Sequence, residues 1–264
     1  MFSGFYTVAS GVLTQQRAIN VMTNNLVNQK TPGYQAERLV TTTFDYEYVL
    51  RKDAYSRTRI GGASPIRLTA EVPVLLDSGL MEETGRPLDF ALDGKGFFNI
   101  RPFADENGEG EQADGEAQPG VYLTRNGNFS LDGEGYLVLN GIGRVLDANG
   151  QDIQLGTSDF TVTADGYIYN NEGDEIGQFM LTWPGLEEID RYSNGLYAPK
   201  DPANNPIMQD IRVAQAHLET SGVDPNQEMT QVMAANRNLQ ACTVAMKVID
   251  DLNQRSASSI AKIG

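Results

Sequence analysis

The C-terminal part of the chain contains a long stretch, from Asn226 to Lys262, that holds neither proline nor glycine. Within this stretch apolar and small residues recur every three or four positions, which is the period of an amphipathic helix. The stripe consists of Val232, Ala235, Leu239, Cys242, Met246, Ile249, Asn253, Ser256 and Ile260. A helix of about 35 residues would be about 50 Å long at about 1.5 Å per residue. Because this length is greater than the width of one small hydrophobic core, the pattern predicts a helix that packs against another helix.

Both ends of the chain carry helical signals. Asp224 is a good N-cap for the C-terminal helix, and Pro225 suits its first position. Near the N-terminus a similar stripe of three and four spacings is formed by Phe5, Val8, Val12, Gln15, Ile19, Met22 and Leu26. This helix should end near Gln29, because Thr31-Pro32-Gly33 disfavours helix continuation. We expect the two terminal helices to pair as a coiled coil.

The region between the helices has the pattern of antiparallel β-structure. Short apolar or alternating runs are separated by turn dipeptides such as Asp93-Gly94, Asn126-Gly127, Asn140-Gly141 and Asp165-Gly166. A weak repeat relates Phe129–Leu131 and Gly135–Leu137 to Phe160–Val162 and Gly166–Ile168, and each copy predicts a strand, a turn and a strand. The fold class predicted is therefore α+β, with a β-rich central domain between two terminal helices.

Composition and residue counts exclude several functions. The 264 residues carry a net charge of −15, which disfavours nucleic acid and anionic membrane surfaces as partners. With one histidine, His217, and one cysteine, Cys242, a His/Cys zinc site is excluded. Gly94-Lys95-Gly96 precedes a predicted strand, so it is not a phosphate loop. We expect no catalytic, cofactor-binding or metal-binding residues, and no enzyme activity.

The sequence also bears on membrane insertion, on a signal peptide and on an exposed acidic segment. No stretch approaches the roughly 20 apolar residues that span a bilayer, so membrane insertion is not expected. Residues 1–13 lack the basic start of a secretory signal, and we expect no cleaved signal peptide. Residues 104–120 are nearly devoid of apolar side chains and rich in acids, which predicts a mobile acidic loop.

Four blocks in this sequence resemble the signatures of flagellar rod and hook proteins, in the order found in that family. The first runs from Thr23 to Tyr34, and the second from Thr84 to Phe98. The third spans Thr124–Phe129 with Gly135–Val138, and the fourth spans Leu218–Asp224. The motif residues of the first two blocks are Asn24, Asn25, Leu26, Asn28, Thr31, Pro32, Gly33, Gly85, Pro87, Leu88, Asp89, Gly94, Gly96, Phe97 and Phe98. Lys30, Ala216 and Gly222 depart from the family pattern, where asparagine, glycine and asparagine respectively are usual.

The resemblance implies a structural subunit of the flagellar basal-body rod that transmits torque and polymerises through its terminal helices. The implied parts are an N-terminal core helix (1–35), an extended linker (36–72), a β-rich outer domain (73–217) and a C-terminal core helix (218–264). The expected assembly interface is Phe5, Val8, Val12, Ile19, Met22, Leu26, Val232, Leu239, Met246 and Ile249. The implied partners are other copies, other rod and hook proteins, and the type III export apparatus of the flagellum.

Three alternatives remain open from the sequence. The chain could be a hook subunit, although the short span between Gly33 and Gly79 favours a rod subunit, with a slight preference for the proximal rod. It could be an extracellular β-sandwich enzyme, which would need a cleft with perturbed acids. It could also be an adhesin-like binding module with a helical dimerisation arm.

Overall fold

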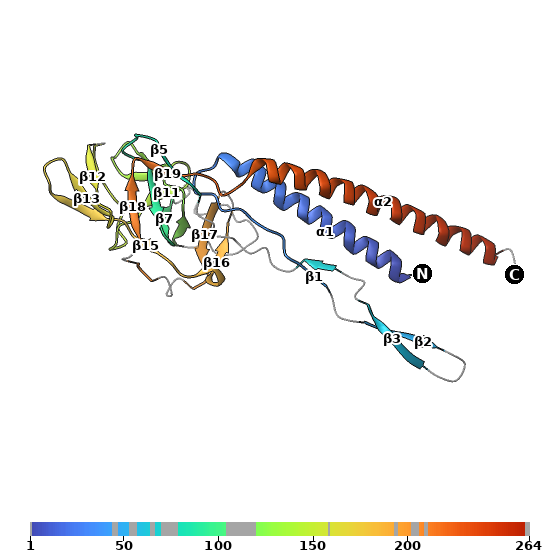
Figure 1. The fold of residues 1–264 in the computed structure, drawn as a ribbon. Helices are drawn as coiled ribbons and strands as arrows, with labels where there is room; N and C mark the ends of the chain where they lie inside the picture. Colours follow the sequence, from blue (N-terminus) through green and yellow to red (C-terminus); the bar gives the residue numbers. More distant parts are fainter. Residues whose placement is uncertain are drawn as a thin grey trace. The chain divides into compact units, whose positions relative to one another are not determined.

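The structure is a computed structural model that describes residues 2–43, 47–52, 57–63, 67–69, 79–103, 120–157, 159–192, 195–201, 206–208 and 211–261. The chain divides into two compact units, and Figure 1 labels the two long helices and many of the strands. Unit 1 comprises residues 1–27, 37–75 and 224–264. Unit 2 comprises residues 28–36 and 76–223.

Unit 1 is built around two helices, α1 (Phe2–Val27) and α2 (Pro225–Ala261), which lie side by side (Figure 1). The predicted start of α2 is confirmed, because Oδ1 of Asp224 accepts hydrogen bonds from the amides of Asn226 (3.0 Å) and Gln227 (3.4 Å). The predicted helix end at Lys262 falls one residue beyond the described range. After α1, the short 3₁₀ helix η1 (Asn28–Lys30) ends the helical run where Pro32 and Gly33 were expected to stop it.

The segment between residues 37 and 69 forms paired strands. β1 (Thr41–Thr43) pairs antiparallel with β4 (Arg67–Thr69), and β2 (Glu47–Lys52) pairs antiparallel with β3 (Arg57–Ala63). The sequence predicted only an extended linker over residues 36–72. Threonine, tyrosine and valine, which favour pleated strands, are frequent here, and this propensity accounts for the paired ribbons.

Unit 2 contains a large antiparallel sheet. In the described part of the chain its strand order is β16-β17-β8-β7-β11-β10-β9, and β15 pairs with β7 as well. These strands are β7 (Phe97–Pro102), β8 (Tyr122–Thr124), β9 (Ser130–Leu131), β10 (Leu137–Leu139), β11 (Gly143–Val145), β15 (Leu181–Thr182), β16 (Ile189–Arg191) and β17 (Leu196–Pro199). A short 3₁₀ helix, η2 (Leu186–Glu188), precedes β16.

Smaller sheets complete unit 2. β12 (Phe160–Val162), β13 (Tyr167–Asn170) and β14 (Glu175–Gln178) form an antiparallel sheet. β6 (Phe90–Asp93) pairs with β18 (Arg212–Gln215), and β5 (Met81–Glu83) pairs with β19 (His217–Glu219). The sequence repeat is confirmed as structure, because β9 pairs with β10 and β12 pairs with β13, each across one turn.

The core of unit 2 is a cluster of aromatic and aliphatic side chains from these sheets. Phe90, Phe98, Phe129 and Phe179 are buried together, with ring centroids 5.1–6.0 Å apart. The predicted α+β class, with antiparallel sheets and two terminal helices, is confirmed. The predicted acidic loop, residues 104–120, lies outside the described residues except for Gly120.

Candidate assembly surface on the terminal helices

One face of α2 is turned toward α1. The described members of its predicted stripe, Val232 to Ser256, are all buried or half-buried, whereas nearly all other α2 positions are exposed. Ala235 is the most buried residue of this helix, and Cys242 lies opposite Gly11 of α1. We call this stripe the inner line of α2. Its spacing of three and four matches the a and d positions of a heptad.

The face of α1 that packs most tightly differs from the predicted apolar stripe. Its buried residues are Thr14, Ala18 and Asn25, which share a helical line with Gly11. The predicted stripe lies beside this line: Val8, Val12, Ile19, Met22 and Leu26 are half-buried, and Phe5 is 36% exposed. The buried line thus carries small and polar residues, and Asn25 on this line hydrogen-bonds Glu37 and Glu228. The apolar stripe of α1 therefore keeps accessible surface within unit 1.

A second apolar line on α2 was not predicted from the sequence. It comprises Met229, Met233, Val244, Val248 and Leu252, and each of these side chains is at least half exposed. At 100° per residue Met233, Val244 and Val248 fall on the side of α2 roughly opposite the inner line, whereas Met229 and Leu252 lie on the two flanks of that side. We call all of these residues the outer line. A helix that is apolar on two opposite faces has more apolar surface than one neighbouring helix can cover.

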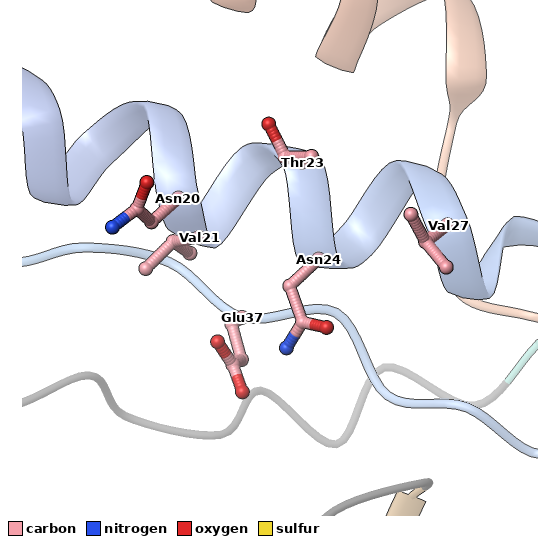
Figure 2. A pocket seen from close by; sticks show the side chains of 6 residues that line it. All are labelled: Asn20, Val21, Thr23, Asn24, Val27 and Glu37. Carbon is pink, nitrogen blue, oxygen red and sulfur yellow. The ribbon is translucent and has the colours of Figure 1, made fainter.

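A shallow groove of about 570 Å³ lies on the outer side of α1. Figure 2 shows that five of its lining side chains come from α1 and that Glu37 comes from the extended segment beside it. The α1 residues are Asn20, Val21, Thr23, Asn24 and Val27. The groove is open and mixes amides with two valines, which suits a protein segment better than a buried small molecule.

A cluster of buried hydrogen bonds around Asn25 connects the two helices and the segment after α1. The side chain of Asn25 is fully buried and hydrogen-bonds both Glu37 and Glu228. Its Nδ2 donates to the carbonyl oxygen of Glu37 (2.8 Å) and to Oε1 of Glu228 (3.3 Å), and its Oδ1 accepts from the amide of Glu37 (2.9 Å). Asn25 is therefore a structural residue of the helix pair.

The carboxyl of Glu228 in this cluster has a raised pKa. Burial raises its pKa above the usual glutamate value, and the neighbouring charge of Asp224 raises it further. The hydrogen bond from Asn25 and the positive charge of Arg38 act in the opposite direction without cancelling the rise. The charged form of Glu228 is thus disfavoured by the folded structure.

The motif residues of unit 2 meet at one place. Oδ1 of Asn28 accepts from Thr31 Oγ1 (3.3 Å), and the turn through Pro32 places Gly33 against the backbone of Arg125. The carbonyl oxygens of Gly94 and Gly96 accept hydrogen bonds from Nη1 of the same arginine. The first two motif blocks, far apart in sequence, therefore converge on Arg125, which belongs to the third block but was not predicted as a site residue.

The remaining motif residues have structural positions in the β-sheets. Asp89 is buried and its Oδ2 accepts from Thr84 Oγ1 (2.7 Å), just after the turn at Gly85, Pro87 and Leu88. Phe98 packs in the core, and the ring of Phe97 stacks on Trp183 at 5.8 Å. Asn24 and Leu26 lie in the last two turns of α1.

The described residues also bear on metal binding, membrane insertion and the role of the histidine. There, no three histidine, cysteine or acidic side chains gather as a metal site. Within the same residues no helix combines the length and apolarity that crossing a membrane requires. His217 belongs to β19, and its Nδ1 lies 2.8 Å from the carbonyl oxygen of Gln215, as a structural histidine would.

Comparison with known proteins gives a consistent result. The sequence profile "Flagellar basal body rod FlgEFG protein C-terminal" matches residues 214–260, which include β19 and most of α2. The chain is 26% identical to the flagellar basal-body rod protein FlgF of Caulobacter vibrioides over 100% of this chain and 99% of that protein. It is 29% identical to FlgF of Rhizobium meliloti, with 94% and 93% covered.

A third relative is the flagellar basal-body rod protein FlgG of Bacillus subtilis, which is 26% identical over 96% of this chain and 97% of that protein. The similarity therefore extends over both units, from the N-terminal helix through the β-sheets to α2. Over nearly its whole length the chain is therefore similar to flagellar basal-body rod proteins.

Proposed function

We propose that the chain is a structural subunit of the flagellar basal-body rod, in which α1 and α2 contact neighbouring subunits and transmit torque. Its relatives are named as basal-body rod proteins, which are structural components of the flagellum and not enzymes. The chain is accordingly a structural protein of the flagellar basal body, where it assembles with other axial components.

The exposed apolar side chains of the outer line of α2 are the main support for assembly through the helices. Burying five apolar side chains that are half exposed or more would release a substantial hydrophobic free energy, of about 25 cal/mol for each Å² removed from water. A contact between the outer line of one subunit and a different surface of the next is heterologous, and its repetition builds an open filament. The half-exposed apolar stripe of α1, from Phe5 to Leu26, supplies a surface of matching character.

Further parts of the proposal concern partners and topology. The helices pair as a coiled coil in the axial core, unit 2 lies on the outside of the rod, and the neighbours are copies of this chain and other rod and hook proteins. The chain reaches the rod through the type III export apparatus of the flagellum. We favour the rod over the hook because the relatives carry rod names across the full length of the chain.

The test is electron microscopy of purified basal bodies that carry a labelled chain. An epitope inserted at the exposed turn Glu172-Gly173 of unit 2 leaves the helices untouched. The proposal predicts label along the rod and loss of the rod, or of the structures beyond it, in a strain that lacks the chain. Label confined to the hook would support the hook alternative, and absence of label from basal bodies would reject both.

A further inference from the structure

Unit 2 contains a buried ion pair between Arg125 and Glu219. Nε of Arg125 donates to Oε2 of Glu219 at 2.8 Å, and both side chains are 1% exposed. The guanidinium also donates to the carbonyl oxygens of Leu92 (3.2 Å), Gly94 (2.6 Å) and Gly96 (3.0 Å). It therefore fills the turn between β6 and β7 and is anchored in the β-sheet core.

The carboxylate of Glu219 binds two further chain segments. Its Oε1 accepts from Nε2 of Gln35 (3.1 Å) and from the amide of Gly79 (3.0 Å). The backbone carbonyl of Glu219 accepts from the amide of Gly33 at 2.8 Å. One residue thus joins the segment around residues 33–35, the segment at residue 79 and its own strand β19.

These three segments lie next to three of the four points at which the chain passes between unit 2 and unit 1. Unit 2 consists of residues 28–36 and 76–223, so the chain passes between the units at residues 27/28, 36/37, 75/76 and 223/224. Gln35, Gly79 and Glu219 each lie within four residues of such a passage. Additional backbone bonds tie them to one another, from the amide of Gly222 to Tyr34 (3.0 Å) and from the amide of Thr220 to Leu80 (2.9 Å).

Two glycines are required by this arrangement. A Cβ at Gly33, whose φ is 65°, would overlap the carbonyl of Arg125. A Cβ at Gly79 would overlap the carbonyl of Thr220. The backbones therefore approach as closely as glycine permits, and the charges sit where water is excluded.

A buried ion pair is weak evidence for stability, because the cost of desolvating two charges offsets most of their attraction. Removal of one partner is a different matter, since it leaves the other charge buried and unpaired. The pair therefore acts mainly on the arrangement of the groups around it.

We propose that the Arg125–Glu219 ion pair is a latch that locks the three connecting segments of unit 2 together, so that they open in one cooperative step. In an assembled rod, force passing between the helices and the β-sheets would be shared by these three connections rather than by one. This consequence rests on the proposed function, whereas the latch itself is tested on the isolated chain and does not depend on assembly.

The experiment is amide hydrogen exchange on the full chain, which reports local opening residue by residue. Glu219→Gln keeps the shape of the side chain and removes its charge. We expect at least tenfold faster exchange at the amides of Gly33, Gly79 and Gly222. Core amides such as Leu137 and Phe179, which bond to Ile153 and Gly166, should exchange at unchanged rates. A general loss of stability would instead accelerate both sets equally and would overturn the proposal.

A milder variant tests cooperativity and remains informative if Glu219→Gln does not fold. Gln35→Ala removes one tether and leaves the ion pair intact. The latch predicts faster exchange at Gly79 and Gly222 as well as at Gly33, whereas independent anchors would give a change at residues 33–35 alone. The control is Asp152→Asn, which removes the charge that pairs with Arg101 and Arg144 elsewhere in the same unit and should leave the latch amides unaffected.

Discussion

The side chain of Asn25 hydrogen-bonds both the amide and the carbonyl oxygen of Glu37, as a neighbouring β-strand would. This pairing holds the segment that follows α1 alongside the helix. The same amide nitrogen also bonds Glu228 at the start of α2. A single buried residue in the Asn-Asn-Leu motif therefore fixes the relation between three parts of unit 1.

Replacing Asn25 with aspartate should destabilise unit 1. The change removes a donor and places a second carboxylate against Glu228 and the carbonyl of Glu37, and an unsatisfied buried group costs about 1–3 kcal/mol. We expect the helical circular-dichroism signal to melt earlier by a corresponding amount. Asn20→Asp, at an exposed position of the same helix, is the control and should melt like the native chain. Equal melting of all three proteins would show that the Asn25 contacts contribute little.

Glu228 gives unit 1 a defined pH dependence. Because its folded pKa is raised above the unfolded value, the folded state binds a proton more readily than the unfolded state. The stability of the native chain, relative to Glu228→Gln, should therefore increase as the pH falls from 7 through the folded pKa toward about 4.5. Chemical denaturation of both proteins across this range measures the difference.

The opposite slope would contradict this account of Glu228. A carboxylate stabilised chiefly by the positive end of the helix would lose stability on protonation, since the helix dipole favours a negative charge in the first turn. The sign of the slope thus decides whether burial or the dipole dominates at this position.

Ala216 is a strained residue between β18 and β19. Its φ is 61°, and among the described residues no other non-glycine residue has a positive φ. The left-handed conformation costs a non-glycine residue about 1–2 kcal/mol, part of which the greater chain entropy of glycine would offset. Ala216→Gly should therefore raise the unfolding free energy of unit 2 by about 0.5–1 kcal/mol. Ala214→Gly, in the extended strand β18, should lower it instead, and a loss of stability from Ala216→Gly would argue against strain.

The strain at Ala216 also explains a departure in the sequence. The resemblance to flagellar rod and hook proteins predicted glycine at this position, and the positive φ supplies a physical reason for that expectation. The sequence showed that alanine at position 216 is unexpected. It did not predict the left-handed conformation of this residue, which depends on tertiary contacts. The amide of Ala216 donates to Asp89, and its carbonyl accepts from Thr84.

The local signals in the sequence predicted most of the helices and many strands. Asp224 and Pro225 mark the start of α2, and Pro32-Gly33 marks the end of the first helical region, because capping and proline chemistry act over a few residues. The repeat beginning at Phe129 and Phe160 predicted two hairpins for the same reason. Strand order in the large sheet depends on long-range pairing, and no local pattern predicts it.

The candidate surface was predicted in part. The inner line of α2 follows from apolar periodicity, but the buried line of α1 does not, because Gly11, Thr14 and Ala18 are small and carry little hydrophobic signal. The outer line was overlooked because one stripe already accounted for the helical pattern. The Arg125–Glu219 pair joins residues 94 positions apart, and charged residues are expected at the surface when only the sequence is known.

Leu239 and Val248 occupy different faces of α2, and their substitution should have different effects. Leu239 lies on the inner line and is half-buried against α1. Leu239→Asp should destabilise the helix pair in the isolated chain by about 2 kcal/mol or more, since a charge replaces a packed apolar group. Thermal melting of the helical signal measures this effect. A native melting profile would indicate that Leu239 faces solvent in the isolated chain.

The central claim, that the terminal helices build the rod through surfaces left exposed in one subunit, is tested most directly by Val248→Asp. Val248 is 52% exposed on the outer line, so the isolated variant should melt like the native chain. Asn238→Asp, at an exposed position outside both lines of α2, is the matched control. In a flagellated strain that lacks the native chain, swimming and the recovery of labelled protein in purified basal bodies are measured for both variants. The account predicts that Val248→Asp abolishes both while Asn238→Asp restores both. Normal swimming with Val248→Asp protein present in the basal bodies would contradict it.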